Sequence, residues 1–218
     1  MVRILRACRT LAHPRPKSDR ILVWDWPVRI GHWLLVAAFL LAWLTRESET
    51  WRLVHAYAGG AMAGVVIFRL FWGVVGTRHA RFTSFVRGPG AALAYLRTLV
   101  SGRPIHTTGH NPAGGLAILA LLVLTLLAAA SGWLVYQDLG GHALEELHEG
   151  LSKVLLAVAL VHVAGVAVGS LAHKENLVRA MVTGYKQGQP DEAITHARPL
   201  AALALVAWVA LCAWCLAQ

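Results

Sequence analysis

Four histidines inside apolar stretches are the residues most able to do chemistry in this chain. Two of them, His148 and His162, lie 14 residues apart in one long apolar stretch, 144–173. At about 3.6 residues per turn, this separation places both imidazoles on nearly the same face of a helix. At about 1.5 Å per residue they lie roughly 21 Å apart along its axis. That distance is too great for one shared metal ion, but it suits two separate cofactors.

The composition indicates a membrane protein. Of 218 residues, 57% are hydrophobic and 14% are charged, whereas soluble domains carry about 25% charged residues. The mean hydropathy is +0.56, and the apolar runs are long enough to cross a bilayer. We therefore expect an all-α integral membrane protein with a four-helix transmembrane bundle and a fifth, C-terminal span.

The chain divides into four segments by polarity. Residues 1–27 form a basic N-terminal segment, 28–172 a four-span core, 173–198 a polar loop and 199–217 the fifth span. The expected spans of the core are 28–45, 52–75, 112–136 and the stretch through His148 and His162 to 172. Between the second and third spans, residues 76–112 form a longer loop with a short interfacial helix.

The sequence WDWP at residues 24–27 indicates a helix start at the membrane surface. Pro27 suits the first helical position, directly after Asp25 and Trp26. The tryptophans at positions 24, 26 and 33 suit the interfacial aromatic belt. The three cysteines, Cys8, Cys212 and Cys215, do not form a disulfide framework.

The positive charge of the chain follows membrane sidedness. The formal net charge is +9. If residues 1–29 lie in the cytoplasm and the spans alternate, all but three of the 20 Lys and Arg residues lie on the inner side, and the exceptions are Arg46, Arg52 and Lys153. The positive-inside rule therefore predicts a cytoplasmic N-terminus. Membrane lipid, and no nucleic acid, is the partner that this charge distribution implies.

With that topology the histidines pair by depth. His32 lies near the inner face with His162, while His55 and His148 lie near the outer face. Ionisable residues within a span are costly and by default suggest function. Haem iron takes two axial imidazoles from separate helices of a bundle. We therefore predict two haem groups, one above the other, with His142 as the substitute ligand if His148 fails.

Small and cationic residues accompany these histidines. Gly59 and Gly165 follow His55 and His162 by four and three residues and would leave space for a flat ring, although glycines also serve close helix packing. Arg69 lies 14 residues after His55, at the inner cofactor level, where it would bind a haem propionate or a quinone, or snorkel to the interface. Arg52 and Lys153 would serve the outer haem in the same way, or simply mark the interface.

The chain resembles the bacterial dihaem cytochrome b561 family, which includes the b-type subunits of nickel–iron hydrogenases. The resemblance runs from about residue 22 to 187 and rests on six stretches: VWDWPVRIGHW, VHAYAGGAMAGVVIFRLFWGVVGTRHARF, FVRGPGAALAYL, GHNPAGG, ELHEGLSKVLLAVALVHVAGV and HKENLVRAMVTG. It implies two b haems in a four-helix core. The family's ligands on the first, second and fourth spans fall here on His32, His55, His148 and His162.

The function expected from these residues and from the resemblance is electron relay within or across the bacterial cytoplasmic membrane. The relay would connect the quinone pool with a redox partner on the periplasmic side, a cytochrome c or a hydrogenase-like subunit. No catalytic residue is predicted, and the cytochrome works alone or as a subunit of an oxidoreductase. A quinone pocket is expected at the inner haem, near Arg69, Arg78, His79, His110 and Lys174.

Three other functions remain open from the sequence. A superoxide:quinone oxidoreductase would need a positive outer haem edge, and the acidic outer loops disfavour it. A metal-ion transporter would use the histidines as steps through the bundle. A membrane anchor without haem would bind its redox partner whether or not the histidines were present.

Overall fold

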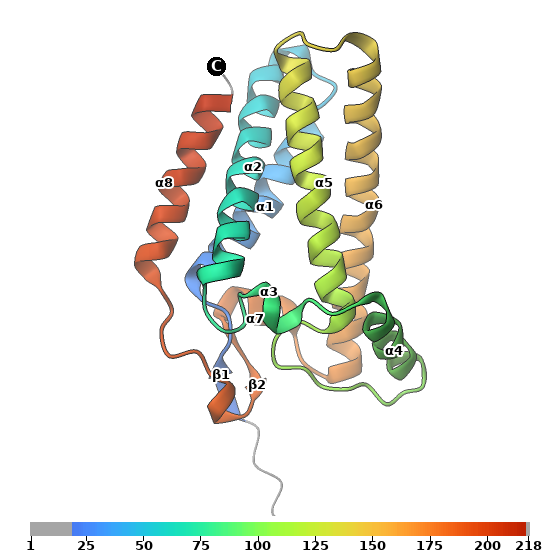
Figure 1. Cartoon of the computed structure of the whole chain (residues 1–218), viewed down its shortest axis with the longest axis vertical. Coiled ribbons are helices and arrows are strands. Elements are labelled where there is room, and N and C mark those ends of the chain that lie inside the picture. Colours follow the sequence, from blue (N-terminus) through green and yellow to red (C-terminus); the bar gives the residue numbers. More distant parts are fainter. Residues whose placement is uncertain (1–18, 217–218) are drawn as a thin grey trace, which may run out of the picture.

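The computed structural model describes residues 19–216. The five longest helices among them are each long and apolar enough to cross a membrane. The prediction of an all-α membrane protein with a fifth span is therefore confirmed. The bounds of these helices (Figure 1) are α1 Trp26–Thr45, α2 Arg52–Val75, α5 Pro112–Tyr136, α6 Gly141–His173 and α8 Pro199–Leu216.

Residues 1–18 and 217–218 lie outside the described part of the chain. Most of the predicted basic N-terminal segment, and Cys8 within it, therefore lies outside the described residues.

The long helices pack as neighbours in a bundle. α1 packs against α2, α2 against α5 and α5 against α6 (Figure 1). α6 makes most of its helix–helix contacts with α5, and its buried residues are Leu155 and Gly169. α6 therefore depends on one neighbouring span, α5, for most of its direct packing.

The fifth span, α8, packs on α2 through small residues. A Cβ atom added at Gly64 would lie 2.9 Å from Cys212 Cβ, and one added at Gly60 would lie 3.0 Å from the backbone of Ala213. Gly60 and Gly64 form a small-xxx-small motif, which lets two helix backbones approach closely. Trp208 Nε1 also donates a hydrogen bond of 3.0 Å to the Gly64 carbonyl. These contacts fix α8 beside α2 and bury Cys212 more than the exposed Cys215.

Short elements cover one end of the bundle, which we name the inner end after the predicted topology. Strands β1 (Asp19–Leu22) and β2 (Tyr185–Gly188) pair in antiparallel register, with Leu22 opposite Tyr185. The remaining elements are α3 Phe82–Phe85, α4 Pro89–Val100, α7 Leu177–Thr183, and the 3₁₀ turns η1 Glu49–Trp51 and η2 Pro190–Glu192. The short helix expected in the loop 76–112 is therefore present as α4.

The segment predicted as a polar loop, 173–198, contains the short elements α7, β2 and η2. The two strands are short and polar, DRIL and YKQG. They lack the alternation of apolar residues that signals a strand. Tertiary contacts with the ends of the spans, and not local pattern, determine their conformation.

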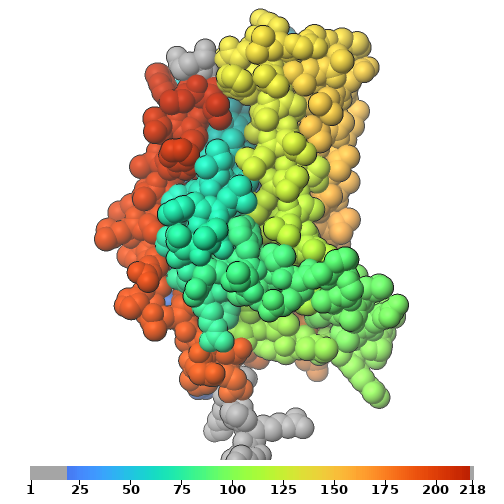
Figure 2. Space-filling view, in the orientation of Figure 1, coloured from blue at the N-terminus to red at the C-terminus, as the bar shows by residue number. Residues whose placement is uncertain are grey.

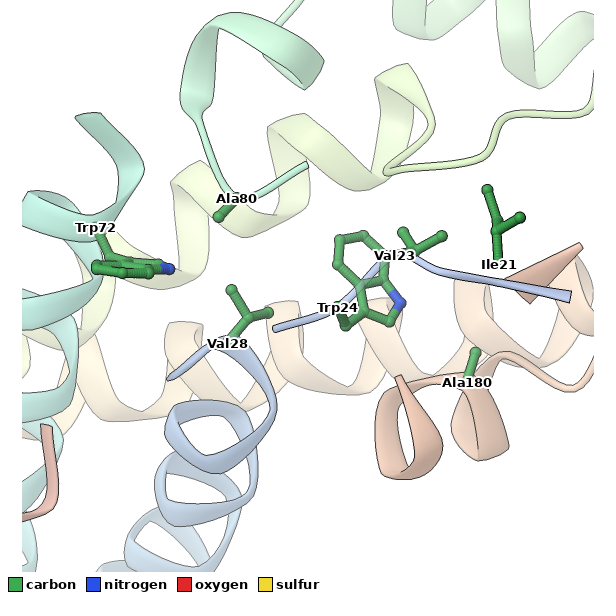
Figure 3. Packing of buried hydrophobic residues seen from close by; sticks show 7 residues of the cluster. All are labelled: Ile21, Val23, Trp24, Val28, Trp72, Ala80 and Ala180. Carbon is green, nitrogen blue, oxygen red and sulfur yellow. The ribbon is translucent and has the colours of Figure 1, made fainter. Parts of the chain in front are cut away.

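A hydrophobic cluster joins this inner cap to the spans. Figure 3 shows its buried members: Ile21, Val23, Trp24, Val28, Trp72, Ala80 and Ala180. The expectation that Trp24 belongs to the interfacial belt is wrong, because this side chain is only 5% exposed. Trp26 and Trp33, at 41% and 39% exposed, keep the partial exposure that a belt residue needs.

Asp25 ties the start of α1 to the end of α2. Its carboxylate is fully buried, and Oδ1 accepts a hydrogen bond of 2.9 Å from the Val28 amide as a helix N-cap. Oδ2 accepts from Trp72 Nε1 at 2.9 Å and from Thr77 Oγ1 at 2.7 Å. The predicted helix start is therefore present one residue earlier than expected, because Trp26 is the first helical residue and Pro27 the second.

Replacement of Asp25 by alanine should destabilise the protein, because it leaves three donors without their acceptor. A lost cap or an unsatisfied buried donor costs roughly 1–3 kcal/mol, so the apparent melting temperature in detergent should fall by several degrees. Thr77→Val, which removes one of the three hydrogen bonds, is the matched control and should have a smaller effect. Equal melting temperatures for Asp25→Ala and the unmodified protein would contradict this role.

Candidate haem-binding sites

The outer histidines face each other across the bundle. His55 lies in the first turn of α2 and His148 in the second turn of α6. Their ring centres are 6.1 Å apart and their planes are nearly perpendicular, at 88°. The sequence pairs His55 with His148 only by their expected depth in the membrane. The structure places these two residues side by side, although their helices are far apart in the sequence.

Backbone carbonyls fix the orientation of both outer imidazoles. His55 Nδ1 lies 2.9 Å from the Ala42 carbonyl of α1, and His148 Nδ1 lies 3.0 Å from the Ala128 carbonyl of α5. A carbonyl oxygen only accepts, so each Nδ1 carries the proton and each Nε2 keeps a free lone pair. Histidines that bind metals usually have this second hydrogen bond. The two rings therefore present their ligating nitrogens in the tautomer that an iron ion requires.

A cavity of about 790 Å³ surrounds this pair and is lined by residues of α1, α2, α5 and α6. Its volume lies within the roughly 300–1,000 Å³ typical of cofactor and ligand sites. Gly59 lines it, and a Cβ atom added there would meet nothing within 4 Å. This open space beside His55 suits a flat ring, which is the role predicted for Gly59.

Gly132 of α5 is a further glycine at this site. It lines the cavity, and a Cβ atom added to it would lie 2.7 Å from His148 Cε1. No larger residue could therefore occupy this position without moving the His148 ring. Sequence reasoning does not separate Gly132 from the glycines that serve helix packing, because its contact with His148 depends on how α5 and α6 meet.

The predicted cations of the outer site lie at the cavity. Arg52 and Lys153 both line it. The Arg52 guanidinium lies 5.3 Å from the centre of the Tyr136 ring, and Lys153 pairs with Glu149 one turn earlier on α6. His142, the alternative ligand, also lines the cavity, but its side chain is 82% exposed and pairs with Glu145 and Glu146. The structure therefore favours His148 over His142 as the partner of His55.

The inner histidines lie on α1 and α6. His32 and His162 are partly buried and lie within electrostatic reach of each other. Among the described residues, nothing offers a hydrogen bond to the buried His32 Nδ1. Gly165, predicted to leave space beside His162, has no atom within 4 Å of an added Cβ. A buried imidazole nitrogen without a partner among the described residues fits a ligand-binding role for His32.

Arg69 of α2 approaches the same level. Its guanidinium lies 5.0 Å from the centre of the Phe82 ring and 5.8 Å from that of Phe85. Its Nη1 atom is buried and has no hydrogen-bond partner within the part of the chain that the structure describes. A buried N–H group without an acceptor is costly. Arg69 is therefore poised to bind an anionic or carbonyl oxygen.

His110 lies next to this arginine in the loop before α5. Its ring centre is 4.5 Å from that of Trp24 and 4.8 Å from that of Phe85. Burial, followed by the positive charges of Arg69 and Lys186, holds the pKa of His110 well below its ordinary value. The ring is therefore neutral at physiological pH, with one nitrogen as donor and the other as acceptor.

His79 is a second neutral imidazole of the inner end. It is 7% exposed, and its Nε2 lies 2.7 Å from the Glu192 carbonyl, to which it donates. Burial lowers the pKa of His79, and this hydrogen bond only partly opposes that effect. Of the other residues predicted near a quinone, Arg78 donates to the Asp191 carbonyl at 2.9 Å, and Lys174 is exposed at the end of α6.

Comparison with curated proteins finds relatives that are named as B-type cytochrome subunits of Ni/Fe-hydrogenases. A probable Ni/Fe-hydrogenase 1 B-type cytochrome subunit of Escherichia coli K12 is 25% identical over 157 residues, which cover 59% of this chain. This chain spans 66% of that relative, just under two thirds of its length. A probable Ni/Fe-hydrogenase B-type cytochrome subunit of Rhizobium leguminosarum bv. viciae is 23% identical over 223 residues, which cover 79% of this chain and 92% of the relative. No solved structure matches the chain.

A protein family described as prokaryotic cytochrome b561 matches residues 23–184. That range is well over half of the chain, and it contains both histidine pairs, Arg69 and the outer cavity. The described α8 lies beyond it. The chain thus belongs to the prokaryotic cytochrome b561 family of membrane electron-transfer proteins, b-type cytochromes whose cofactor is haem b.

Proposed function

We propose that this protein is a dihaem cytochrome that relays electrons across the bacterial cytoplasmic membrane between the quinone pool and a redox partner at the outer face. The observation that best supports two imidazole ligands at one level is the outer pair, His55 and His148. Both rings line one cavity of about 790 Å³, and each commits its Nδ1 to a backbone carbonyl. The matched depth of His32 and His162 supports a second site of the same kind.

Each site uses residues of the chain in a defined way. His55 and His148 would hold the outer haem, and His32 and His162 the inner one. When bound, haem iron supplies one-electron redox chemistry at a potential that its surroundings set. Gly59 and Gly165 leave room beside a histidine at each level.

Cationic side chains would bind the carboxylates of the two haems. Arg52 and Lys153 line the outer cavity. At the inner level the free Nη1 of Arg69 would bind a haem propionate or a quinone oxygen.

The positions of the charged residues support a proposed orientation and division of the chain. We place the N-terminal segment 1–27 and the segment 173–198 in the cytoplasm, the four-span core at 28–172 and the fifth span at 199–217. Support comes from the charges, because between Glu49 and Asp138 the sequence has no acidic residue. The five arginines in the loop after α2 therefore mark the inner face of the membrane.

The two ends of the bundle suit different partners. At the inner end, Arg69 lies near the neutral ring of His110, and both groups can donate hydrogen bonds to the oxygens of a quinone. The single N–H of neutral His79 is already donated to the Glu192 carbonyl, so His79 could only accept. At the outer end, acidic residues outnumber basic ones around the cavity. The names of the relatives support a hydrogenase-like subunit as the outer partner, and a cytochrome c is the second candidate. The acidic residues are Glu47, Glu49, Asp138, Glu145, Glu146 and Glu149.

The first test is the haem content of the purified protein. A pyridine haemochrome assay should give two b haems per chain, with low-spin bands in the dithionite-reduced spectrum. His55→Ala or His148→Ala should remove one haem, and His32→Ala or His162→Ala should remove the other. His55→Ala combined with His32→Ala should remove both, because each pair holds one group.

The control for these variants is His142→Ala, which should keep two haems because His142 is exposed at the rim. One haem in the unmodified protein would mean that the inner or the outer pairing is wrong. No haem after expression with sufficient haem would overturn the relay and favour a metal-ion transporter.

A second prediction concerns Gly132. Replacement by alanine places a methyl group 2.7 Å from the His148 ring, so the ring must leave its present position. We expect Gly132→Ala to lose the outer haem or to convert it to a high-spin form, as seen in the visible spectrum. Gly150→Ala is the matched control on α6, because a Cβ atom there meets nothing within 4 Å. Identical spectra for the two variants would contradict the proposal that Gly132 leaves the space that the His148 ring occupies when it binds haem.

A third prediction concerns Arg69 and the quinone. Loss of a charge-assisted hydrogen bond costs roughly 1.5–3 kcal/mol, so Arg69→Gln should slow reduction of the haems by a short-chain quinol at least tenfold. Stopped-flow absorbance measures this rate, and the haemochrome assay measures haem content in the same sample.

The two measurements on Arg69→Gln separate its roles. A slower rate with two haems indicates quinone binding, whereas loss of the inner haem indicates binding of a propionate. Arg81→Gln, at an exposed inner-face arginine, is the control and should change neither. Unchanged rate and haem content in Arg69→Gln would show that Arg69 serves neither group.

A further inference from the structure

The helix α4 exposes a stripe of large apolar side chains. Leu93, Leu96 and Val100 are 51%, 46% and 91% exposed. Their spacing places them on one side of the helix. Ala92 and Tyr95, on the neighbouring side, are 6% and 5% exposed and form the face that packs on the protein. The exposed stripe is therefore a second apolar face that the packing of the chain leaves uncovered.

Specific contacts hold α4 in this orientation. The Tyr95 hydroxyl lies 2.9 Å from His173 Nε2 at the end of α6, and their rings stack with planes 17° apart. The ring of His106, in the loop after α4, lies 5.9 Å from that of His173. α4 also packs along α5. The exposure of the stripe is thus a consequence of the fold.

The position of α4 relative to the membrane follows from the spans. α2 ends at Val75 and α5 begins at Pro112, so the segment 76–111 lies at one face of the membrane. α4 lies at that end of the bundle, to the side of α5 and α6 (Figure 1), and the green surface of this segment projects from the bundle in Figure 2. A projecting helix at this level meets the boundary between lipid tails and headgroups.

The charge of the same segment is entirely positive. It contains five arginines and no Asp or Glu. Arg97 lies in the last turn of α4, while Arg87 and Arg103 flank the helix, and all three are exposed. Within residues 19–216, none of these three arginines forms an ion pair. An apolar stripe bordered by exposed arginines that form no ion pair within the described residues is the pattern of a helix that binds an anionic membrane surface.

We propose that α4 is an interfacial helix that binds anionic phospholipids of the adjacent leaflet, with Leu93, Leu96 and Val100 among the acyl chains. Arg87, Arg97 and Arg103 bind the headgroup phosphates. Bound lipid covers the apolar stripe and supplies the negative charge that this segment lacks. Through Tyr95 and His173, the lipid-bound helix anchors the inner end of α6, the helix that carries His148 and His162.

The depth of α4 in the membrane can be measured with spin labels. The holoprotein, with its three cysteines replaced by serine, is labelled at Val100→Cys or at Ala94→Cys and placed in nanodiscs of phosphatidylcholine with phosphatidylglycerol. Ala94 is exposed about 120° around α4 from Val100, off the apolar stripe, and is the matched control. The label at 100 should be accessible to oxygen and protected from a water-soluble nickel chelate, and the label at 94 should show the reverse.

Water-like accessibility at both positions would overturn the proposal. Protection of position 100 from both reagents would also overturn it, because that result indicates a protein occupant in place of lipid.

The lipid headgroup is tested by native mass spectrometry. Addition of phosphatidylglycerol to Arg87→Gln/Arg97→Gln/Arg103→Gln should give at least tenfold weaker binding than to the unmodified protein. The variant Arg20→Gln/Arg179→Gln/Arg198→Gln removes the same charge from the same end of the bundle away from α4, and it should bind normally. The haem spectrum of each variant reports that it is folded. Equal losses in both variants, or equal binding of phosphatidylcholine and phosphatidylglycerol, would overturn a site on α4.

Discussion

The hydrogen bonds from two histidine rings to helix carbonyls are the constraint on which the outer site depends. His55 donates to α1 through Ala42, and His148 donates to α5 through Ala128. Each imidazole is therefore oriented by a helix other than its own, and the approach of the two rings depends on the relative positions of four helices. The same bonds decide the tautomer, so they set both the direction and the chemistry of the ligand. Packing at Gly132 removes the remaining freedom of the His148 ring.

The sequence was sufficient for the features that follow from helix period and hydropathy. The 14-residue separation of His148 and His162 is a property of α6 alone, and the apolar runs predict all five spans. The features that it could not supply depend on contacts between distant segments. The β1–β2 pair, the burial of Trp24 and the contact of Gly132 with His148 each need the position of a second element. No local pattern encodes such a position when the strands are short and polar.

Asp25 has one role that local sequence rules predict and another that depends on contacts between distant segments. Its place before Trp26 and Pro27 marks a helix start by local rules, and the structure has that cap. Its other oxygen binds Trp72 and Thr77, at the inner end of α2, which no spacing rule predicts. This buried carboxylate joins α1 and α2 beneath the level of His32, so the inner end of the bundle is held by polar contacts as well as by the hydrophobic cluster.

The packing of α6 explains why both proposed sites use this helix. α6 makes most of its helix–helix contacts with α5, yet its histidines pair with α2 at the outer level and with α1 at the inner level. In the proposed arrangement, each haem would join α6 to a helix on which it packs little. Cofactor binding and assembly of the bundle would then be linked, because the free energy of haem ligation adds to that of helix association. A helix with few direct neighbours is therefore consistent with a core that is completed by two planar groups.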